Sequence, residues 1–201
     1  MGCFIVMISH DPPFIFVHLT KTAGTSVDYT LKHLAEIPEG KHKVKHETIL
    51  QLLKQCKKDP SEYFKFTTVR NPFDRLLSNY FYRIERLKDP KILDVDMSFS
   101  EWITGEKGYS FKDTMVKRTM YSWLSDKKGN LLMDYIIRFE HLQEGFSEVC
   151  SKLKLPDYQL PHTFQTDHKH YSSYYSPEAI DCVYIHYKKD LEIFNYTYDL
   201  P

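Results

Sequence analysis

Two short segments of the sequence carry cationic and hydroxyl side chains at points where a helix is expected to begin. The first runs from Lys21 through Thr22, Ala23, Gly24 and Thr25 to Ser26. A helix N-terminus offers backbone N–H groups and the positive end of the helix dipole, and a glycine lets an anion approach the backbone closely. Three hydroxyl groups and the lysine add further donors. This pattern predicts a phosphate-binding loop.

The first segment differs from a Walker A motif, because its lysine precedes the single glycine; the Walker motif requires Gly-x4-Gly-Lys-Ser/Thr. A simpler alternative stays open at this point. The segment could be an ordinary strand-to-helix turn in which Thr25 or Ser26 caps the helix.

The second segment begins at Arg70 and continues as Asn71-Pro72-Phe73-Asp74-Arg75-Leu76-Leu77-Ser78. Arg70 is expected at a strand end and Ser78 two turns into the next helix, about 80° around its axis from Arg70. A planar guanidinium beside a hydroxyl group is a good clamp for a monophosphate. Arg75 is expected to brace the helix by pairing with Asp74, with Asn79 or with an acid elsewhere.

Three apolar runs rich in β-branched and aromatic residues predict the strands that position these segments, at residues 14–18, 64–69 and 134–139. Helices are expected to follow them, at 25–35, at 141–153, and from Pro72 to about Leu87 with Asn71 as the N-cap. Strands that alternate with helices predict an α/β fold, a central parallel sheet flanked by helices, in a single domain over 1–201. Ligands of such sheets bind at the carboxyl ends of the strands, where both segments lie.

The rest of the chain predicts a short helix at 99–104, a helix at 112–124, a turn at 126–130 and a final helix from Pro177 to about Phe194. Residues 160–176 are expected to form a loop or lid, because they combine Pro161 with many polar and aromatic residues.

Composition excludes several classes of protein. The 201 residues carry 27 Lys and Arg against 27 Asp and Glu, so a general nucleic-acid or membrane-surface binder is not expected. No stretch approaches the roughly 20 apolar residues of a membrane span, and the N-terminus lacks signal-peptide features. The four cysteines are scattered, which disfavours a disulfide framework or a zinc site, and no metal is expected. A reduced, cytoplasmic protein is the expectation.

Taken together, FIFVHLTKTAGTS and FKFTTVRNPFDRLLSNYFY resemble the PAPS-dependent sulfotransferases, in particular the carbohydrate and heparan sulfate 2-O type and their small bacterial relatives. The resemblance implies a P-loop-like sulfotransferase fold and a donor nucleotide, 3′-phosphoadenylyl sulfate (PAPS), with 3′-phosphoadenosine 5′-phosphate (PAP) as the product. It implies that Lys21–Ser26 hold the 5′-phosphosulfate and that Arg70 and Ser78 hold the 3′-phosphate. A C-terminal lid supplements this clamp in such enzymes, and the candidates here are Thr166, Lys169 and Tyr171.

The resemblance also implies a mechanism. Sulfuryl transfer is an in-line displacement at sulfur, in which the protein positions the groups and neutralises charge on the leaving phosphate. Lys21 is the candidate for that neutralisation. His46 occupies the position of the family's general base, with His42 as the neighbour that could replace it. The alternative for His46 is a solvated basic patch with Lys43 and Lys45.

Other functions and roles stay open from the residues alone. A nucleotide kinase-like phosphotransferase and a non-catalytic nucleotide-binding module are the competing functions. The acceptor is a hydroxyl compound, expected to be a carbohydrate, and the six lysines of residues 41–58 suit either an anionic oligosaccharide or a solvated helix face. His18 is expected to be a packed strand-end histidine. Trp123 either lines the acceptor face or fills the core.

Overall fold

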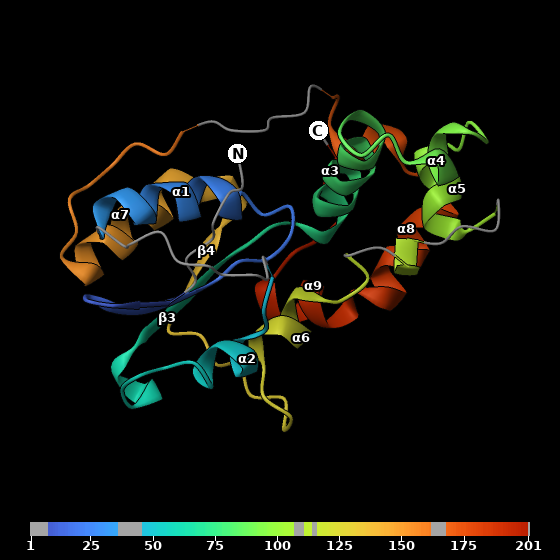
Figure 1. Ribbon diagram of the computed structural model, residues 1–201. Coiled ribbons are helices and arrows are strands. Elements are labelled where there is room, and N and C mark those ends of the chain that lie inside the picture. Colours follow the sequence, from blue (N-terminus) through green and yellow to red (C-terminus); the bar gives the residue numbers. More distant parts are fainter. Residues whose placement is uncertain (1–7, 36–45, 107–110, 114–115, 162–167, 201) are drawn as a thin grey trace. The chain divides into compact units, whose positions relative to one another are not determined.

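Figure 1 presents the computed structural model of the chain, in which residues 8–35, 46–106, 111–113, 116–161 and 168–200 are described. The chain divides into two compact units. The first, called here the sheet unit, comprises residues 1–69 and 122–163, and the second, the helical unit, comprises residues 70–121 and 164–201. The expectation of one domain over 1–201 stays a prediction, and each unit is described by itself.

A four-stranded sheet organises the sheet unit. Its strands are β1 (Ile8–His10), β2 (Pro13–Val17), β3 (Phe64–Val69) and β4 (Tyr135–Arg138), in the order β1-β2-β3-β4. β2, β3 and β4 are parallel, with Phe16 opposite Phe66 and Phe66 opposite Tyr135, whereas β1 pairs with β2 in the antiparallel direction. The predicted α/β class with a parallel central sheet is confirmed, and the antiparallel edge strand β1 is an addition.

Helices α1 (Gly24–Leu34) and α7 (Leu142–Leu153) pack together on one face of this sheet (Figure 1). Alternate strand residues point to one face, so the rings of Phe14, Phe16 and Phe66 meet the apolar sides of the two helices there. The ring centroids of Phe16 and Phe66 lie 5.2 Å apart. Ile15 is also fully buried, so both faces of β2 are covered. Phenylalanine rings therefore account for much of this core.

The remaining elements of the sheet unit are short. They are the helix α2 (Ile49–Leu53), the 3-10 turns η1 (Pro60–Glu62) and η3 (Phe139–His141), and the predicted turn at 126–130. α2 lies within the lysine-rich segment and begins with a capping box between Thr48 and Gln51. It lies on the side of the strands away from α1 and α7 in Figure 1.

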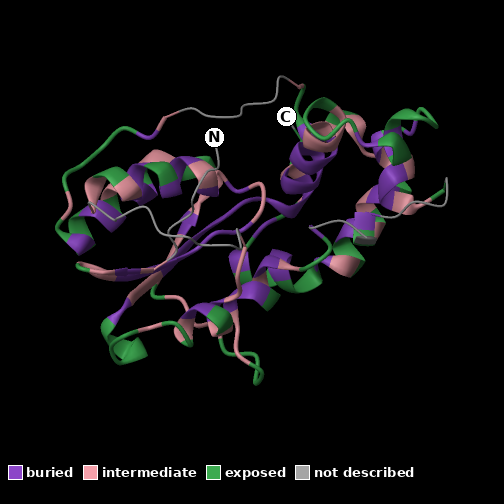
Figure 2. Ribbon diagram, viewed as in Figure 1, coloured by how far each residue is buried: buried purple, intermediate pink, exposed green. Residues whose placement is uncertain are grey.

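The helical unit contains α3 (Pro72–Glu85), α4 (Pro90–Leu93), α5 (Phe99–Thr104), η2 (Phe111–Asp113), η4 (Tyr171–Tyr174), α8 (Pro177–His186) and α9 (Lys188–Phe194). The first turns of α3 are almost wholly buried (Figure 2). Its Phe73 is surrounded by the rings of Tyr171, Tyr175, Tyr184 and Tyr198, with centroid distances from 4.9 to 6.1 Å. This ring cluster is the centre of the unit.

Two of the predicted helices differ from the structure. The helix expected at 112–124 is reduced to η2 and α6 (Met120–Leu124), because the buried carboxylate of Asp190 accepts hydrogen bonds from the N–H groups of Met120 and Tyr121, at 2.7 and 2.8 Å. The final helix is divided into α8 and α9 at Tyr187. This residue leaves helical geometry and donates its buried hydroxyl to the Val116 carbonyl.

The predicted N-cap at Asn71 is confirmed, since its side-chain oxygen accepts a hydrogen bond from the Phe73 N–H at 3.1 Å. Its amide also donates to the Thr197 carbonyl at 2.8 Å, which ties the start of α3 to the C-terminal segment. We expect Asn71→Ala to lower the free energy of unfolding by about 1–2 kcal/mol, the usual cost of losing a cap. Urea denaturation measures this loss. Asn79→Ala, later in the same helix, provides the comparison, and an equal loss in both variants would contradict the capping account.

Within the described ranges, no helix combines the length and apolar character needed to cross a bilayer, and no three His, Cys, Asp or Glu side chains are grouped to hold a metal ion. Cys56, Cys150 and Cys182 are free thiols. A cytoplasmic location stays a prediction.

Candidate functional site

The loop that follows β2 takes an unusual backbone path into α1. Lys21 and Ala23 both adopt left-handed conformations, each with a φ of 63°. Such a conformation costs a non-glycine residue about 1–2 kcal/mol, and strain of this kind concentrates at ligand-binding loops. The N-cap residue of α1 is Ala23, whose methyl group cannot cap the helix. Thr25 and Ser26 lie within α1, so the structure does not have the alternative turn in which one of them is the N-cap.

Side chains of this loop divide into buried and partly exposed ones. Thr22 is fully buried, and its hydroxyl donates to the Leu19 carbonyl at 3.1 Å and bonds the Thr68 hydroxyl at 2.8 Å. These bonds fix the loop to the carboxyl end of β3. Thr22 can therefore offer an anion its backbone N–H, whereas Lys21 and Thr25 keep partly exposed side chains.

Gly24 is needed for a reason that the sequence does not reveal. A Cβ atom at this position would lie 2.2 Å from Cδ2 and 2.5 Å from Nε2 of His18. The imidazole of His18, rather than a ligand, fills the space that the glycine leaves. His18 is 3% exposed, so the expectation of a packed strand-end histidine is met, and its ring lies against the first residue of α1.

His46 contacts His18 at this same edge of the sheet. Its Nδ1 lies 3.0 Å from the His18 carbonyl oxygen, and the two rings meet edge to face with centroids 5.0 Å apart. The ring of Trp123, 6.3 Å away, meets His46 edge to face as well. Because a carbonyl oxygen only accepts, Nδ1 donates, and the neutral imidazole carries its lone pair on Nε2. His42, Lys43 and Lys45 lie outside the described residues.

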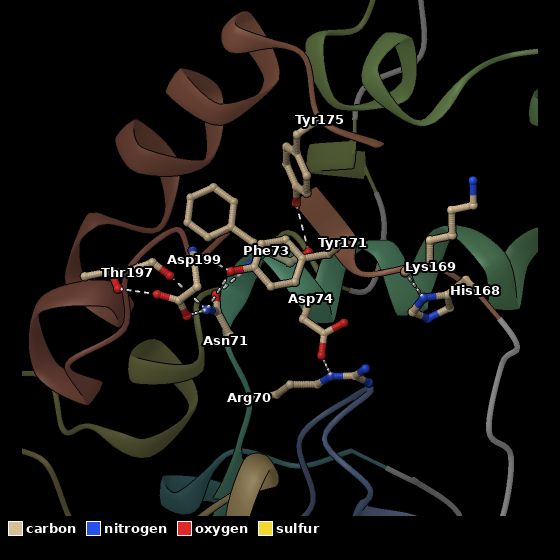
Figure 3. Close-up of polar contacts among 10 residues, drawn as sticks. All are labelled: Arg70, Asn71, Phe73, Asp74, His168, Lys169, Tyr171, Tyr175, Thr197 and Asp199. Atoms are coloured by element: carbon tan, nitrogen blue, oxygen red, sulfur yellow. Dashed lines mark hydrogen bonds and ion pairs between the residues drawn. The ribbon is translucent and has the colours of Figure 1, made fainter. Parts of the chain in front are cut away.

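In the helical unit, Arg70 is oriented by a carboxylate in the first turn of α3, the helix that follows it. Its Nε donates to Asp74 Oδ2 at 2.7 Å, as Figure 3 shows, and its side chain is 11% exposed. Asp74 and Ser78 are four residues apart on α3 and so share one face of it. The guanidinium is thus placed one turn from Ser78, which is buried in α3.

Arg75 has surroundings of a different kind. It is 1% exposed, and burial lowers the pKa of its guanidinium, while nearby Tyr187 and Asp190 favour the charged form. Asp74 pairs with Arg70, whereas the acid whose charge favours the charged form of Arg75 is Asp190; the pairing expected for Arg75 stays a prediction.

The segment predicted as a lid packs on the same helix within the helical unit. His168 stacks on Phe81 of α3 with centroids 5.2 Å apart and ring planes 8° from parallel. The N–H of Lys169 donates to the Tyr174 hydroxyl at 3.3 Å, and its side chain is exposed (Figure 3). Phe81 comes three residues after Ser78, so this segment lies beside the next turn of the helix. Thr166 lies outside the described residues.

Tyr171 points into the interior of the helical unit (Figure 3). Its hydroxyl accepts a hydrogen bond from the Asp199 N–H at 2.7 Å, and burial raises its pKa to about 12. The ring stacks on Phe73, 6.1 Å away. Tyr171 therefore holds the C-terminal segment against α3.

Sequence reasoning missed two features of these sites. The role of Asp74 toward Arg70 could have been found from their i,i+4 spacing. The packing of Trp123 beside His46 joins residues far apart in the chain, and the packing of His18 on Gly24 depends on the path of the loop between them, so no local signal indicates either contact.

The comparison with known proteins gives one match. A model of the sulfotransferase family matches residues 5–197, which covers the β2–α1 loop, β3, α3 and the lid segment. Neither a curated protein nor a solved structure matches. The matched range includes every described residue of the candidate site, and the fold is the expected α/β type. The chain therefore belongs to the sulfotransferase family.

Proposed function

We propose that this sulfotransferase moves a sulfuryl group from PAPS to a hydroxyl group by in-line displacement, with His46 as general base. The acceptor oxygen forms a bond to sulfur while the bond from sulfur to the 5′-phosphate oxygen breaks. The acceptor proton passes to His46 Nε2, and PAP leaves. The observation that carries this proposal is the 3.0 Å contact between His46 Nδ1 and the His18 carbonyl, which leaves Nε2 as the basic atom.

The donor is assigned to the two segments that carry the cationic and hydroxyl groups. The N-terminus of α1, with Lys21 and Thr25, is proposed to bind the 5′-phosphosulfate. Arg70 and Ser78 are proposed to bind the 3′-phosphate, with Lys169 as a supplementary cation. The pairing of Arg70 with Asp74 supports this assignment, because it holds the guanidinium in one orientation. Tyr171 is left out, since its hydroxyl bonds the main chain of Asp199.

The acceptor is proposed to be a carbohydrate that carries acid groups, as the resemblance to the heparan sulfate 2-O type implies. A cavity of about 600 Å³ in the sheet unit supports this, with Leu50 and Leu53 on one side and Lys54, Lys127 and Lys128 around them. Asp126 also lines it, but its carboxylate accepts the N–H groups of Lys128 and Asn130, both at 2.8 Å. The cavity is therefore cationic.

Its position also suits an acceptor. One wall is α2, which begins three residues after His46, and the other is the turn that follows Trp123. His46 and Trp123 are in contact. Each wall of the cavity therefore follows, by a few residues in the chain, one member of this contacting pair.

Transfer of label from ³⁵S-PAPS to a panel of neutral and acidic glycans tests the proposed function. We expect acidic glycans to become labelled at a rate that EDTA does not change, since the proposed site uses no metal. Phosphate transfer that needs Mg²⁺ and ATP would favour the kinase-like alternative instead. PAP binding without any transfer would favour the non-catalytic module.

Replacing the three cavity lysines tests the acceptor. We expect Lys54→Gln/Lys127→Gln/Lys128→Gln to lower kcat/KM for acidic glycans about tenfold, because each exposed charge contributes roughly 0.5 kcal/mol. The kcat/KM for neutral glycans should change less than about twofold. The control is Lys58→Gln/Lys152→Gln/Lys154→Gln, which removes the same charge from exposed positions of the sheet unit that do not line the cavity. Equal losses in the two triple variants would remove the cavity from the acceptor site.

A further inference from the structure

His18 connects the two parts of the proposed site that lie in the sheet unit. Its main-chain carbonyl accepts the Nδ1 proton of His46, and its ring meets the His46 ring edge to face. The same ring also closely approaches Gly24, the first residue of α1. One residue therefore contacts both the proposed base and the helix N-terminus proposed to bind the phosphosulfate.

Packing leaves the His18 ring little freedom to move. The side chain is 3% exposed, the Phe16 ring stacks near it at 5.9 Å, and Gly24 approaches so closely that a methyl group there would overlap the imidazole. His46 also meets the buried ring of Trp123 edge to face. His46 thus contacts two aromatic rings while its Nδ1 bonds a carbonyl oxygen. This arrangement restricts both the tautomer and the orientation of its imidazole.

We propose that His18 is a positioning residue, which acts through His46 and sets the distance from the base to the N-terminus of α1. This inference rests on the proposed function. The carbonyl of His18 selects the His46 tautomer with its lone pair on Nε2. Its imidazole is the spacer between that ring and Gly24. A base within hydrogen-bond reach of the acceptor needs such a fixed position, because a displacement of about 1 Å can cost about a hundredfold in rate.

The first experiment uses the close approach at Gly24. We expect Gly24→Ala to lower kcat at least tenfold, because the new methyl group displaces the His18 ring. Removing that ring should remove the conflict, so adding Gly24→Ala to His18→Ala should change kcat less than about twofold. An equal effect of Gly24→Ala in both backgrounds would mean that the methyl group acts on the ligand directly, and this would overturn the spacer role.

A double-mutant cycle tests whether His18 acts through His46. His18→Ala should lower kcat about tenfold in the wild-type background, with KM for PAPS within about twofold, and should have no effect when His46 is already alanine. Losses that add in the double variant would show a general structural role and overturn the proposal. Thermal unfolding of each variant identifies losses that come from an unfolded fraction.

Nitrogen NMR of the His46 ring gives a readout that does not depend on activity. At a pH where the imidazole is neutral, the wild type should show a protonated Nδ1 and an unprotonated Nε2. His18→Ala and Gly24→Ala keep the main-chain carbonyl of residue 18, but both should let the His46 ring move away from it and so produce a mixture of tautomers. A mixture in the wild type, or a tautomer unchanged in both variants, would overturn the proposal. A fixed tautomer in a protein that transfers no sulfuryl group would instead contradict the proposed function and leave the positioning of His46 intact.

Discussion

Replacing His46 with alanine should lower kcat for sulfuryl transfer about a thousandfold and leave the affinity for PAP within about threefold. A neutral hydroxyl is a weak nucleophile, and a positioned base contributes about 10²–10⁴-fold to such a step. The Nδ1 proton of His46 is bonded to the His18 carbonyl, so Nε2 carries the lone pair that is proposed to take the acceptor proton. PAP lacks the sulfuryl group and the acceptor, so its binding does not require the base.

Timed assays with ³⁵S-PAPS measure the rate of sulfuryl transfer, and calorimetric titration measures the affinity for PAP. His141→Ala is a matched control, because His141 lies in the same unit, is exposed and bonds the exposed Glu144 at 3.1 Å. It should keep nearly full activity. Equal losses of turnover and PAP affinity in the His46 variant would contradict the assignment of His46 as the base and place it in the nucleotide site.

Replacing Arg70 with alanine should weaken PAP binding about a hundredfold while the affinity for AMP changes little, because AMP lacks the 3′-phosphate. A hydrogen bond between charged groups contributes about 1.5–3 kcal/mol, and about 2.7 kcal/mol corresponds to a hundredfold change in affinity. The loss should be large because Asp74 holds the guanidinium in one orientation, so little rotamer entropy is lost when the phosphate binds. Arg70→Lys should recover only part of the affinity, since lysine lacks the planar fork.

Titrations of PAP and AMP against each variant measure this difference. Arg86→Ala removes an exposed arginine just after the same helix and should bind both nucleotides as the wild type does. A similar loss of PAP and AMP affinity in the Arg70 variant would mean that Arg70 does not recognise the 3′-phosphate.

Local sequence signals predicted the elements in which short-range interactions dominate. β3 and α5 have the predicted bounds, and α3 begins at Pro72 after the predicted cap, because a proline at the first helical position and an Asn before it fix that start. The capping box of α2 was a similar signal that the lysine-rich composition obscured. The start of α6 at Met120 could not be predicted, because the carboxylate that caps it, Asp190, is about 70 residues away in the chain.

In the candidate site, too, local sequence signals predicted some features and tertiary packing determined the others. The phosphate-binding pattern of the β2–α1 loop and the Arg70–Ser78 spacing are local, and both were visible in the sequence. The reason for Gly24 was not, because it depends on where the ring of His18 packs. Thr22 and Tyr171 have hydroxyl groups that sequence reasoning assigned to the nucleotide, whereas tertiary packing pairs them with Thr68 and with the main chain of Asp199. A residue type indicates what a side chain can bind, and only its packing decides what it does bind.

The relative use of three donors tests the central claim most directly. Rates of transfer to one acidic glycan are measured with PAPS and with adenosine 5′-phosphosulfate in EDTA, and with ATP in the presence of Mg²⁺. We expect PAPS to be preferred about a hundredfold in kcat/KM over adenosine 5′-phosphosulfate, because only PAPS carries the 3′-phosphate assigned to Arg70 and Ser78, and we expect no transfer from ATP. Equal use of the two sulfate donors, or a preference for ATP, would contradict the account.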